Sequence, residues 1–186
     1  ILFATGGRSP SQRGFLEKIL DARSRGDIEY TNILIRPHPF DVYDNYLEAS
    51  KAPDIYLDKP VKEMSREDFI NLKATLAYTD LNINYKSTIS LESFLFDKPV
   101  INFIDPVLPF QNNAYFDETS YYYPLIREKS VFLAKDNDDL IRGINEYLRN
   151  PKKDRDNRQR VADRFFPFRD GLSYKRNVDL IEKIIQ

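Results

Sequence analysis

The chain contains no cysteine and no tryptophan, and its only histidine is His38. The lack of cysteine excludes disulfide bonds, thiolate metal sites and cysteine nucleophiles. Because His38 is the only histidine, any imidazole chemistry must use it. Apolar runs are only a few residues long, far short of the roughly 20 residues that cross a bilayer.

Positive and negative charges nearly balance, because the chain has 28 Lys and Arg residues and 29 Asp and Glu residues. This balance predicts no general attraction to nucleic acid. Apolar residues make up 41% of the 186 positions, which is enough for a packed core and excludes a disordered chain. The sequence starts at Ile1 inside an apolar run, without an initiator Met or a signal peptide, so we expect a part of a longer protein.

Short β-branched or aromatic runs alternate with longer segments of helical period, which predicts an α/β fold. Several of the short runs carry apolar residues at both odd and even positions, as expected for strands covered by helices on both faces. We expect a Rossmann-like, doubly wound parallel sheet with strand order 3-2-1-4-5-6 and a helical C-terminal tail. The strands are expected at Ile1–Thr5, Asn32–Arg36, Asp54–Leu57, Leu81–Tyr85, Val100–Ile104 and Val131–Ala134.

Helix starts are marked by capping residues. Ser9 with Pro10, Ser65 with acidic residues behind it, and the polar run 137–139 each precede an apolar stripe. A last helix is expected from about Leu172. These positions complete the alternation of strands and helices in a single domain, residues 1–186.

Two segments fit neither period. Residues 105–129 carry three prolines and several tyrosines, and we interpret them as a loop or lid over the strand ends. Their tyrosines are candidates for stacking on a base or for packing against the C-terminal helices. Residues 152–169 are rich in basic side chains. They indicate a solvated helix face, with contact to anionic lipid headgroups or an acidic partner as the alternative.

Candidate ligand-binding residues follow the strands, because open parallel sheets bind ligands beyond the carboxyl ends of their strands. Gly6, Gly7 and Arg8 follow the first strand and precede a helix, a combination that suits a phosphate. Arg36 and His38 follow the second strand, and prolines on both sides of His38 fix its backbone. An imidazole there pairs with phosphate oxygens or gives a proton to a leaving group.

The turn after the fourth strand is the third candidate. Ser87 or Thr88 is expected to cap the next helix, and Glu92 lies one turn further, within reach of a sugar hydroxyl. A common helix cap with an acid near the helix start would show the same residues. All three turns suit a phosphate, and none offers a nucleophile with its base or a cluster of metal-binding carboxylates. We therefore expect no metal and no resident cofactor.

Two stretches carry a resemblance to a known family. The run RPHPF at 36–40, followed by TDLNINYKSTISLESFLFDKPVINF from Thr79 to Phe103, resembles the C-terminal nucleotide-binding domain of GT-B glycosyltransferases. The pattern is similar to that of members with a His-Pro motif that build bacterial surface polysaccharides. These include capsule and sialic-acid transferases and the CDP-glycerol glycerophosphotransferases of teichoic acid synthesis.

The resemblance implies roles for the same residues. Ser87 and Thr88 would contact the donor's phosphates, Glu92 the ribose hydroxyls, and His38 the donor phosphate as the catalytic residue. The turn at 6–8 resembles the loop that reaches the pyrophosphate, and the helices from 152 onward resemble the GT-B tail, which crosses back onto an N-terminal domain.

The leading hypothesis is the donor-binding half of a metal-independent glycosyltransferase that uses a nucleotide sugar in surface polysaccharide synthesis. The alternatives are a CDP-glycerol glycerophosphotransferase, an enzyme similar to UDP-sugar 2-epimerases, or a non-catalytic module that binds a nucleotide or a partner. The expected partners are a nucleotide-activated sugar or CDP-alditol donor, a glycan or lipid-linked acceptor, and an N-terminal domain. The expected location is the cytoplasm, with peripheral contact to the plasma membrane as an option.

Overall fold

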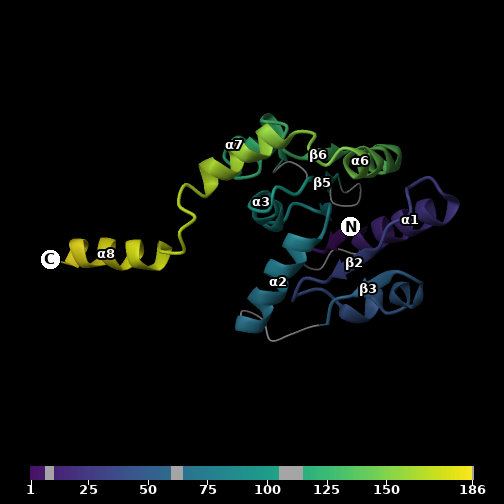
Figure 1. The fold of residues 1–186 in the computed structure, drawn as a ribbon, viewed down its shortest axis with the longest axis horizontal. Helices are drawn as coiled ribbons and strands as arrows, with labels where there is room; N and C mark the ends of the chain where they lie inside the picture. Colours follow the sequence, from purple (N-terminus) through teal and green to yellow (C-terminus); the bar gives the residue numbers. More distant parts are fainter. Residues whose placement is uncertain (7–10, 60–64, 105–114, 186) are drawn as a thin grey trace.

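The computed structural model describes residues 1–6, 11–59, 65–104 and 115–185. Its centre is a parallel sheet in the order β3-β2-β1-β4-β5-β6, which confirms the predicted topology (Figure 1). Every strand lies within its predicted range and is shorter than that range by one or two residues. The strands are β1 (Leu2–Ala4), β2 (Ile33–Arg36), β3 (Ile55–Leu57), β4 (Asn82–Asn84), β5 (Val100–Phe103) and β6 (Phe132–Ala134).

The order places β1 at the centre, between β2 and β4. Phe3 is level with Ile35 of β2 on one side and with Ile83 of β4 on the other. Because the strands are parallel and in register, the residues that follow β1, β2 and β4 emerge at one edge of the sheet. This edge is the carboxyl edge, where the sequence places its candidate residues.

Helices connect the strands and continue beyond them. The cap predicted at Ser65 is confirmed, because its side chain accepts a hydrogen bond from the Asp68 N–H at 3.1 Å. Ser9 and Pro10, the expected start of the first helix, lie outside the described residues. The α-helices are α1 (Ser11–Arg25), α2 (Arg66–Tyr78), α3 (Ile89–Phe94), α5 (Tyr123–Arg127), α6 (Asn137–Arg149), α7 (Arg155–Phe165) and α8 (Ser173–Ile185). Short 3₁₀ turns occupy Tyr43–Tyr46 and Ala49–Lys51.

Both faces of the sheet are covered, as the apolar strands predict. Phe3 and Ile83 belong to the larger core cluster, which α1 and α6 complete. Leu2 and Ala4 point to the opposite face and pack with Leu76 of α2. Successive residues of β1 thus serve opposite faces, which is why the strand is apolar throughout.

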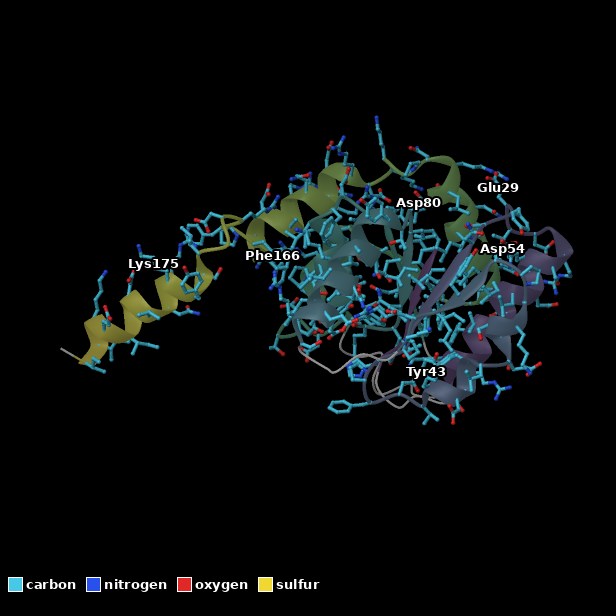
Figure 2. The ribbon with its side chains drawn as sticks, turned by 60° about the horizontal axis from the view of Figure 1, so that its bottom comes forward. Glu29, Tyr43, Asp54, Asp80, Phe166 and Lys175 are labelled. Carbon is cyan, nitrogen blue, oxygen red and sulfur yellow. The ribbon has the colours of Figure 1, made fainter. Side chains whose placement is uncertain are left out.

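The C-terminal helices differ in their attachment. Helix α7 packs against α3, and its Arg158 is fully buried, with Nη2 2.9 Å from the Pro151 carbonyl and 3.2 Å from Asp97 Oδ1. Helix α8 has no buried residue and extends away from the sheet, as the position of Lys175 relative to Phe166 shows (Figures 1 and 2). Its apolar side chains, Val178 and Ile181 among them, are exposed.

The segment 105–129 departs from the expectation of a loop without regular structure. Residues 105–114 lie outside the described part. The remainder contains α5, and Tyr115 and Tyr122 are fully buried. Of the two roles considered for these tyrosines, stacking on a base is therefore wrong for this pair. The rings are part of the protein core.

Candidate functional site

Three turns meet at the carboxyl edge of the sheet. The backbone N–H of His38, after β2, donates to the Thr5 hydroxyl, after β1, at 2.8 Å. On its other side the β1 turn approaches the turn after β4, because a Cβ placed on Gly6 would lie 3.5 Å from the Tyr85 carbonyl oxygen. The structure thus brings together three regions that the sequence identifies as candidates.

The turn after β2 fixes the orientation of the His38 imidazole. The Phe40 N–H donates to His38 Nδ1 at 3.1 Å, and the Asp41 N–H donates to the His38 carbonyl at 2.8 Å. Because Nδ1 accepts a hydrogen bond, the ring proton sits on Nε2. The half-buried side chain therefore presents an N–H donor through its Nε2 atom.

The buried side chain of Tyr46 also stabilises the His38 turn. Tyr46 is fully buried, and its hydroxyl donates to Asp41 Oδ2 at 2.7 Å. Burial is the main cause that raises the pKa of the Tyr46 hydroxyl, and the hydrogen bond to Asp41 adds to it. The His38 turn is thus held by local hydrogen bonds and by an anchor in the core.

Arg36 has a role that the sequence does not reveal. Its guanidinium binds the carboxylate of Asp58 and lies 2.7 Å from Asp68 Oδ1 at the start of α2. The side chain is only 16% exposed. Arg36 therefore links the end of β2 to α2, and its predicted contact with a donor phosphate stays a prediction.

Glu92 lies one turn into α3 and is half-buried. Burial raises the pKa of its carboxyl, and the positive charge of Arg36 partly opposes this shift. Arg36 at the end of β2 and Glu92 in α3 are thus close enough to interact electrostatically. A partly desolvated carboxyl suits hydrogen bonding to hydroxyl groups, such as those of a sugar.

The turn between β4 and α3 is held from within the protein. The Ser87 N–H donates to Asn84 Oδ1 at 3.1 Å, and the Ser87 carbonyl accepts from the Ser90 N–H at 3.0 Å. The capping prediction needs correction. Thr88 occupies the N-cap position, but its side chain makes no capping hydrogen bond, and Ser87 Oγ accepts only a long bond of 3.4 Å from the Ile89 N–H.

The reason lies in the backbone. Thr88 has helical dihedral angles, φ −56° and ψ −22°, whereas a capping side chain needs an extended backbone to reach the following N–H groups. The Thr88 side chain is exposed instead. Its hydroxyl is therefore not committed to the helix start.

A buried polar network beneath this turn was not predicted. Asn84 Nδ2 lies 3.0 Å from Ser90 Oγ, and Asn102 of β5 donates to Asn84 Oδ1 at 3.0 Å. A signal was present in the sequence, because Asn82 and Asn84 alternate with apolar or aromatic residues along the run 81–85. The network members are Asn82, Asn84, Ser90, Ser93, Asn102 and Tyr122.

The turn after β1 is described only in part. Gly6 donates its N–H to Gln12 Oε1 and accepts from Gln12 Nε2 at 3.2 Å, so both of its backbone groups are used inside the protein. Gly7 and Arg8 lie outside the described residues. Their predicted phosphate contacts stay predictions.

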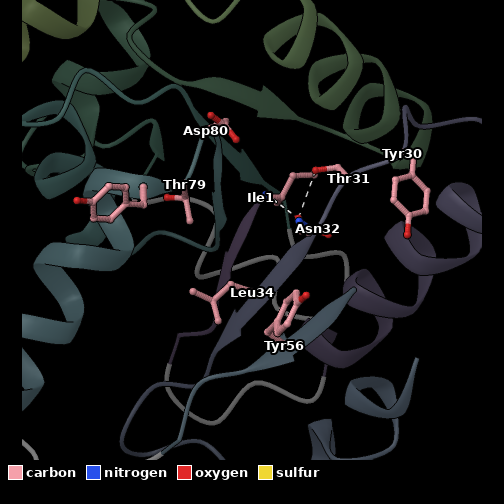
Figure 3. Close-up of a pocket in the computed structure, with 9 residues that line it drawn as sticks. Ile1, Tyr30, Thr31, Asn32, Leu34, Tyr56, Thr79 and Asp80 are labelled. Atoms are coloured by element: carbon pink, nitrogen blue, oxygen red, sulfur yellow. Dashed lines mark hydrogen bonds between the residues drawn. The ribbon is translucent and has the colours of Figure 1, made fainter. Parts of the chain in front are cut away.

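A hollow of about 390 Å³ lies at the opposite, amino edge of the sheet (Figure 3). Ile1, Asn32 and Asp80, which precede β1, β2 and β4, contribute to its lining, and the Ile1 nitrogen donates to the Asn32 carbonyl at 2.8 Å. Because parallel sheets bind ligands at the carboxyl edge, this hollow is separate from the predicted site.

Within residues 1–6, 11–59, 65–104 and 115–185, no group of three or more His, Asp or Glu side chains is placed to hold a metal ion. Each helix in these ranges is too short or too polar to span a bilayer.

The strand order and the three converging turns define a Rossmann-like domain of the type found in GT-B enzymes. The chain belongs to the CDP-glycerol:poly(glycerophosphate) glycerophosphotransferase family, whose sequence model matches residues 17–183. No curated protein has a significant sequence match to the chain. The family match confirms the resemblance, and it favours the glycerophosphotransferase alternative over a transferase that uses a nucleotide sugar.

Solved structures share the fold at low sequence identity. A protein assigned as a UDP-N-acetylglucosamine 2-epimerase of Listeria monocytogenes matches all of this chain with a TM-score of 0.62 and 17% identity. S. aureus MnaA in a co-structure with UDP matches 99% with a TM-score of 0.59 and 16% identity. The wall teichoic acid polymerase TagF matches 99% with a TM-score of 0.55 and 16% identity. The chain covers 44%, 46% and 43% of these proteins, less than half of each.

Proposed function

We propose that the chain binds the activated donor, CDP-glycerol or a related CDP-alditol, for a glycerophosphotransferase of surface-polymer synthesis. The family match over residues 17–183 is the observation that carries this proposal. The geometry supports it, because the turns after β1, β2 and β4 meet at the edge where parallel sheets bind nucleotides.

The activity of the family sets the chemistry that the site must support in this proposal. An acceptor hydroxyl attacks the phosphorus attached to glycerol, the bond from that phosphorus to the bridging oxygen breaks, and CMP leaves. The new ester holds glycerol phosphate, and the hydroxyl proton is released. Negative charge develops on the leaving CMP phosphate, and preorganised hydrogen-bond donors stabilise it.

We assign these donors to three side chains. His38 presents its Nε2–H, because Nδ1 is occupied by the Phe40 N–H. Ser87 and Thr88 lie in the turn after β4, and the exposed Thr88 hydroxyl makes no capping bond. His38 is the catalytic residue in this scheme, since it donates to the leaving group. Arg8 adds a further positive charge in the proposal, and no metal is required.

The remaining binding energy comes from the nucleoside. Glu92, half-buried and with a raised pKa, accepts hydrogen bonds from the ribose hydroxyls in this proposal. Glu92 lies one turn beyond Thr88 in α3, on the helix whose first turn is assigned to the phosphates. The same arrangement serves a UDP-sugar, so the residues alone do not select the base.

The acceptor and the general base belong to a further domain in this proposal. The chain covers less than half of each solved relative named above, which supports the C-terminal half of a two-domain enzyme. Helix α8 extends from the body with exposed apolar side chains, as expected of the GT-B tail that crosses back onto the N-terminal domain. The acceptor is then a glycan or a lipid-linked polymer at the cleft between the domains.

Isothermal calorimetry of the chain with CMP, CDP, CDP-glycerol, UDP and UDP-N-acetylglucosamine tests the proposal. Cytidine ligands should bind, and CDP-glycerol should bind more tightly than CMP. His38→Ala should lower the affinity for CDP-glycerol. Binding of UDP-N-acetylglucosamine with no cytidine ligand bound would favour the epimerase-like alternative instead. Failure of all five ligands would overturn the donor-site proposal.

A further inference from the structure

Tyr122 joins a distant part of the chain to the turn that carries Ser87. Its hydroxyl donates to the Ser87 carbonyl at 2.5 Å and lies 2.9 Å from Ser90 Oγ. The residue is fully buried and is 35 positions away from Ser87 in the sequence. A buried phenol of this kind needs a hydrogen-bond partner, and here both partners belong to the turn after β4 or to α3.

Asn84 holds the same turn from the opposite side. Its Oδ1 accepts from the Ser87 N–H at 3.1 Å, so both backbone groups of Ser87 are bound by buried side chains. Lys86, the preceding residue, has a φ of 42°, in the left-handed region that a lysine rarely adopts. Such a backbone persists where its surroundings determine it. Asn84 and Tyr122, which bind the neighbouring Ser87, help to fix this conformation, together with Tyr115, whose hydroxyl bonds the Lys86 backbone.

Tyr122 is itself fixed in place. Its N–H donates to Ser120 Oγ at 3.2 Å, and its ring packs edge-on against Tyr115 with the centroids 5.5 Å apart. Tyr115 in turn donates to the Phe103 carbonyl at the end of β5, at 3.2 Å. The segment that begins at Tyr115 therefore closes over the ends of β4 and β5 as part of the core.

We propose that Tyr122 and Asn84 are positioning residues, which hold the turn at Ser87 and Thr88 in the conformation that meets the donor's phosphates. The inference rests on the proposed function, because it takes that turn as part of the donor site. Neither side chain touches the donor. Each acts through the backbone of Ser87.

Tyr122→Phe tests this role, and Tyr147→Phe is its matched control. Both variants keep a fully buried ring and lose one hydroxyl, but the Tyr147 hydroxyl bonds Asp154 and not the turn after β4. We expect CDP-glycerol to bind Tyr122→Phe roughly tenfold more weakly than the unchanged chain, as the loss of one hydrogen bond implies. Tyr147→Phe should bind it with unchanged affinity, although both variants should melt at a lower temperature than the unchanged chain.

Hydrogen exchange of the free chain supplies a readout that needs no ligand. Amides of residues 86–90 should exchange faster in Tyr122→Phe than in Tyr147→Phe, because only the first variant removes a hydrogen bond to that turn. Equal exchange in the two variants, or an equal loss of affinity, would overturn the positioning role. If the amides exchange faster in Tyr122→Phe but the unchanged chain binds no donor, Tyr122 still fixes the turn. The donor site, and therefore the role of Tyr122 in donor binding, would then be overturned.

Discussion

The two turns that carry the main candidates are built in opposite ways. The His38 turn is held by neighbouring backbone N–H groups and presents a half-buried ring. The Ser87 turn is held by Asn84 and Tyr122, which are both fully buried. The first turn depends mainly on residues 38–46 and on one bond to Thr5, whereas the second depends on β4, β5 and a segment far along the chain.

Because of this difference, substitutions in the first turn should change ligand affinity, whereas substitutions in the second should also change the stability of the fold. Removing the half-buried imidazole of His38 leaves the core intact, because its one hydrogen-bond donor is the N–H of the exposed Phe40. Removing a member of the network under Ser87 leaves buried donors and acceptors unpaired, which costs about 1–3 kcal/mol for each group. The same site should therefore respond very differently to substitutions in its two halves.

Asn84→Leu should produce the largest effect. The side chain lies between Ser87, Ser90 and Asn102, and a leucine leaves several of their polar groups without partners. We expect the free energy of unfolding to fall by about 3 kcal/mol or more. Urea unfolding followed by circular dichroism measures it. A loss below about 0.5 kcal/mol would show that the network is not a hold on the fold.

His38→Ala should affect the ligand and spare the fold. One charge-assisted hydrogen bond to the donor is lost, so CDP-glycerol should bind roughly 10- to 100-fold more weakly. The melting temperature of the free chain should stay within about 1 °C, since no core contact is removed. A clear drop in melting temperature with unchanged affinity would instead make His38 a structural residue.

Glu92→Gln should lower the affinity only for ligands that contain the nucleoside. CDP-glycerol should bind several-fold more weakly, while pyrophosphate binding stays constant, because Glu92 is assigned to the ribose. The pKa of Glu92 is raised in the folded chain, so its ionised form opposes folding at neutral pH. The variant should therefore melt at the same or a higher temperature. Weaker binding of pyrophosphate would contradict the ribose assignment.

Tyr46→Phe should give the smallest effect, visible in alkaline solution. The raised pKa of Tyr46 means that the unfolded chain loses this proton first as the pH rises through about 10. Stability is thus present below that pH and declines above it. Between about pH 9 and pH 11 the free energy of unfolding should fall less steeply in Tyr46→Phe than in the unchanged chain. Parallel slopes would contradict the account of the Tyr46 anchor.

The fold was predictable because it depends on local patterns. Apolar strands at regular spacing, together with right-handed crossovers, leave few topologies other than the observed order. Helix α5 was missed, because Pro124 and a run of aromatic residues obscure any helical period in its five residues. Its burial depends on contacts with α7, which are distant in the sequence.

The site was predictable only in its outline. Position after a strand identified His38 and Ser87, since the carboxyl edge is common to all parallel strands. The partners of Arg36 were not predictable, because Asp58 and Asp68 lie 22 and 32 residues away and meet it only in the folded chain. The network around Asn84 likewise depends on the pairing of β4 with β5.

Nuclear magnetic resonance of the imidazole nitrogens tests the central claim most directly, because His38 is the only histidine and gives a single set of signals. The account predicts that CDP-glycerol shifts the Nε2 signal with the dissociation constant found by calorimetry. The shift should shrink in Thr88→Ala, since both residues are assigned to the donor's phosphates. An Nε2 signal that stays unmoved while CDP-glycerol binds would contradict the account.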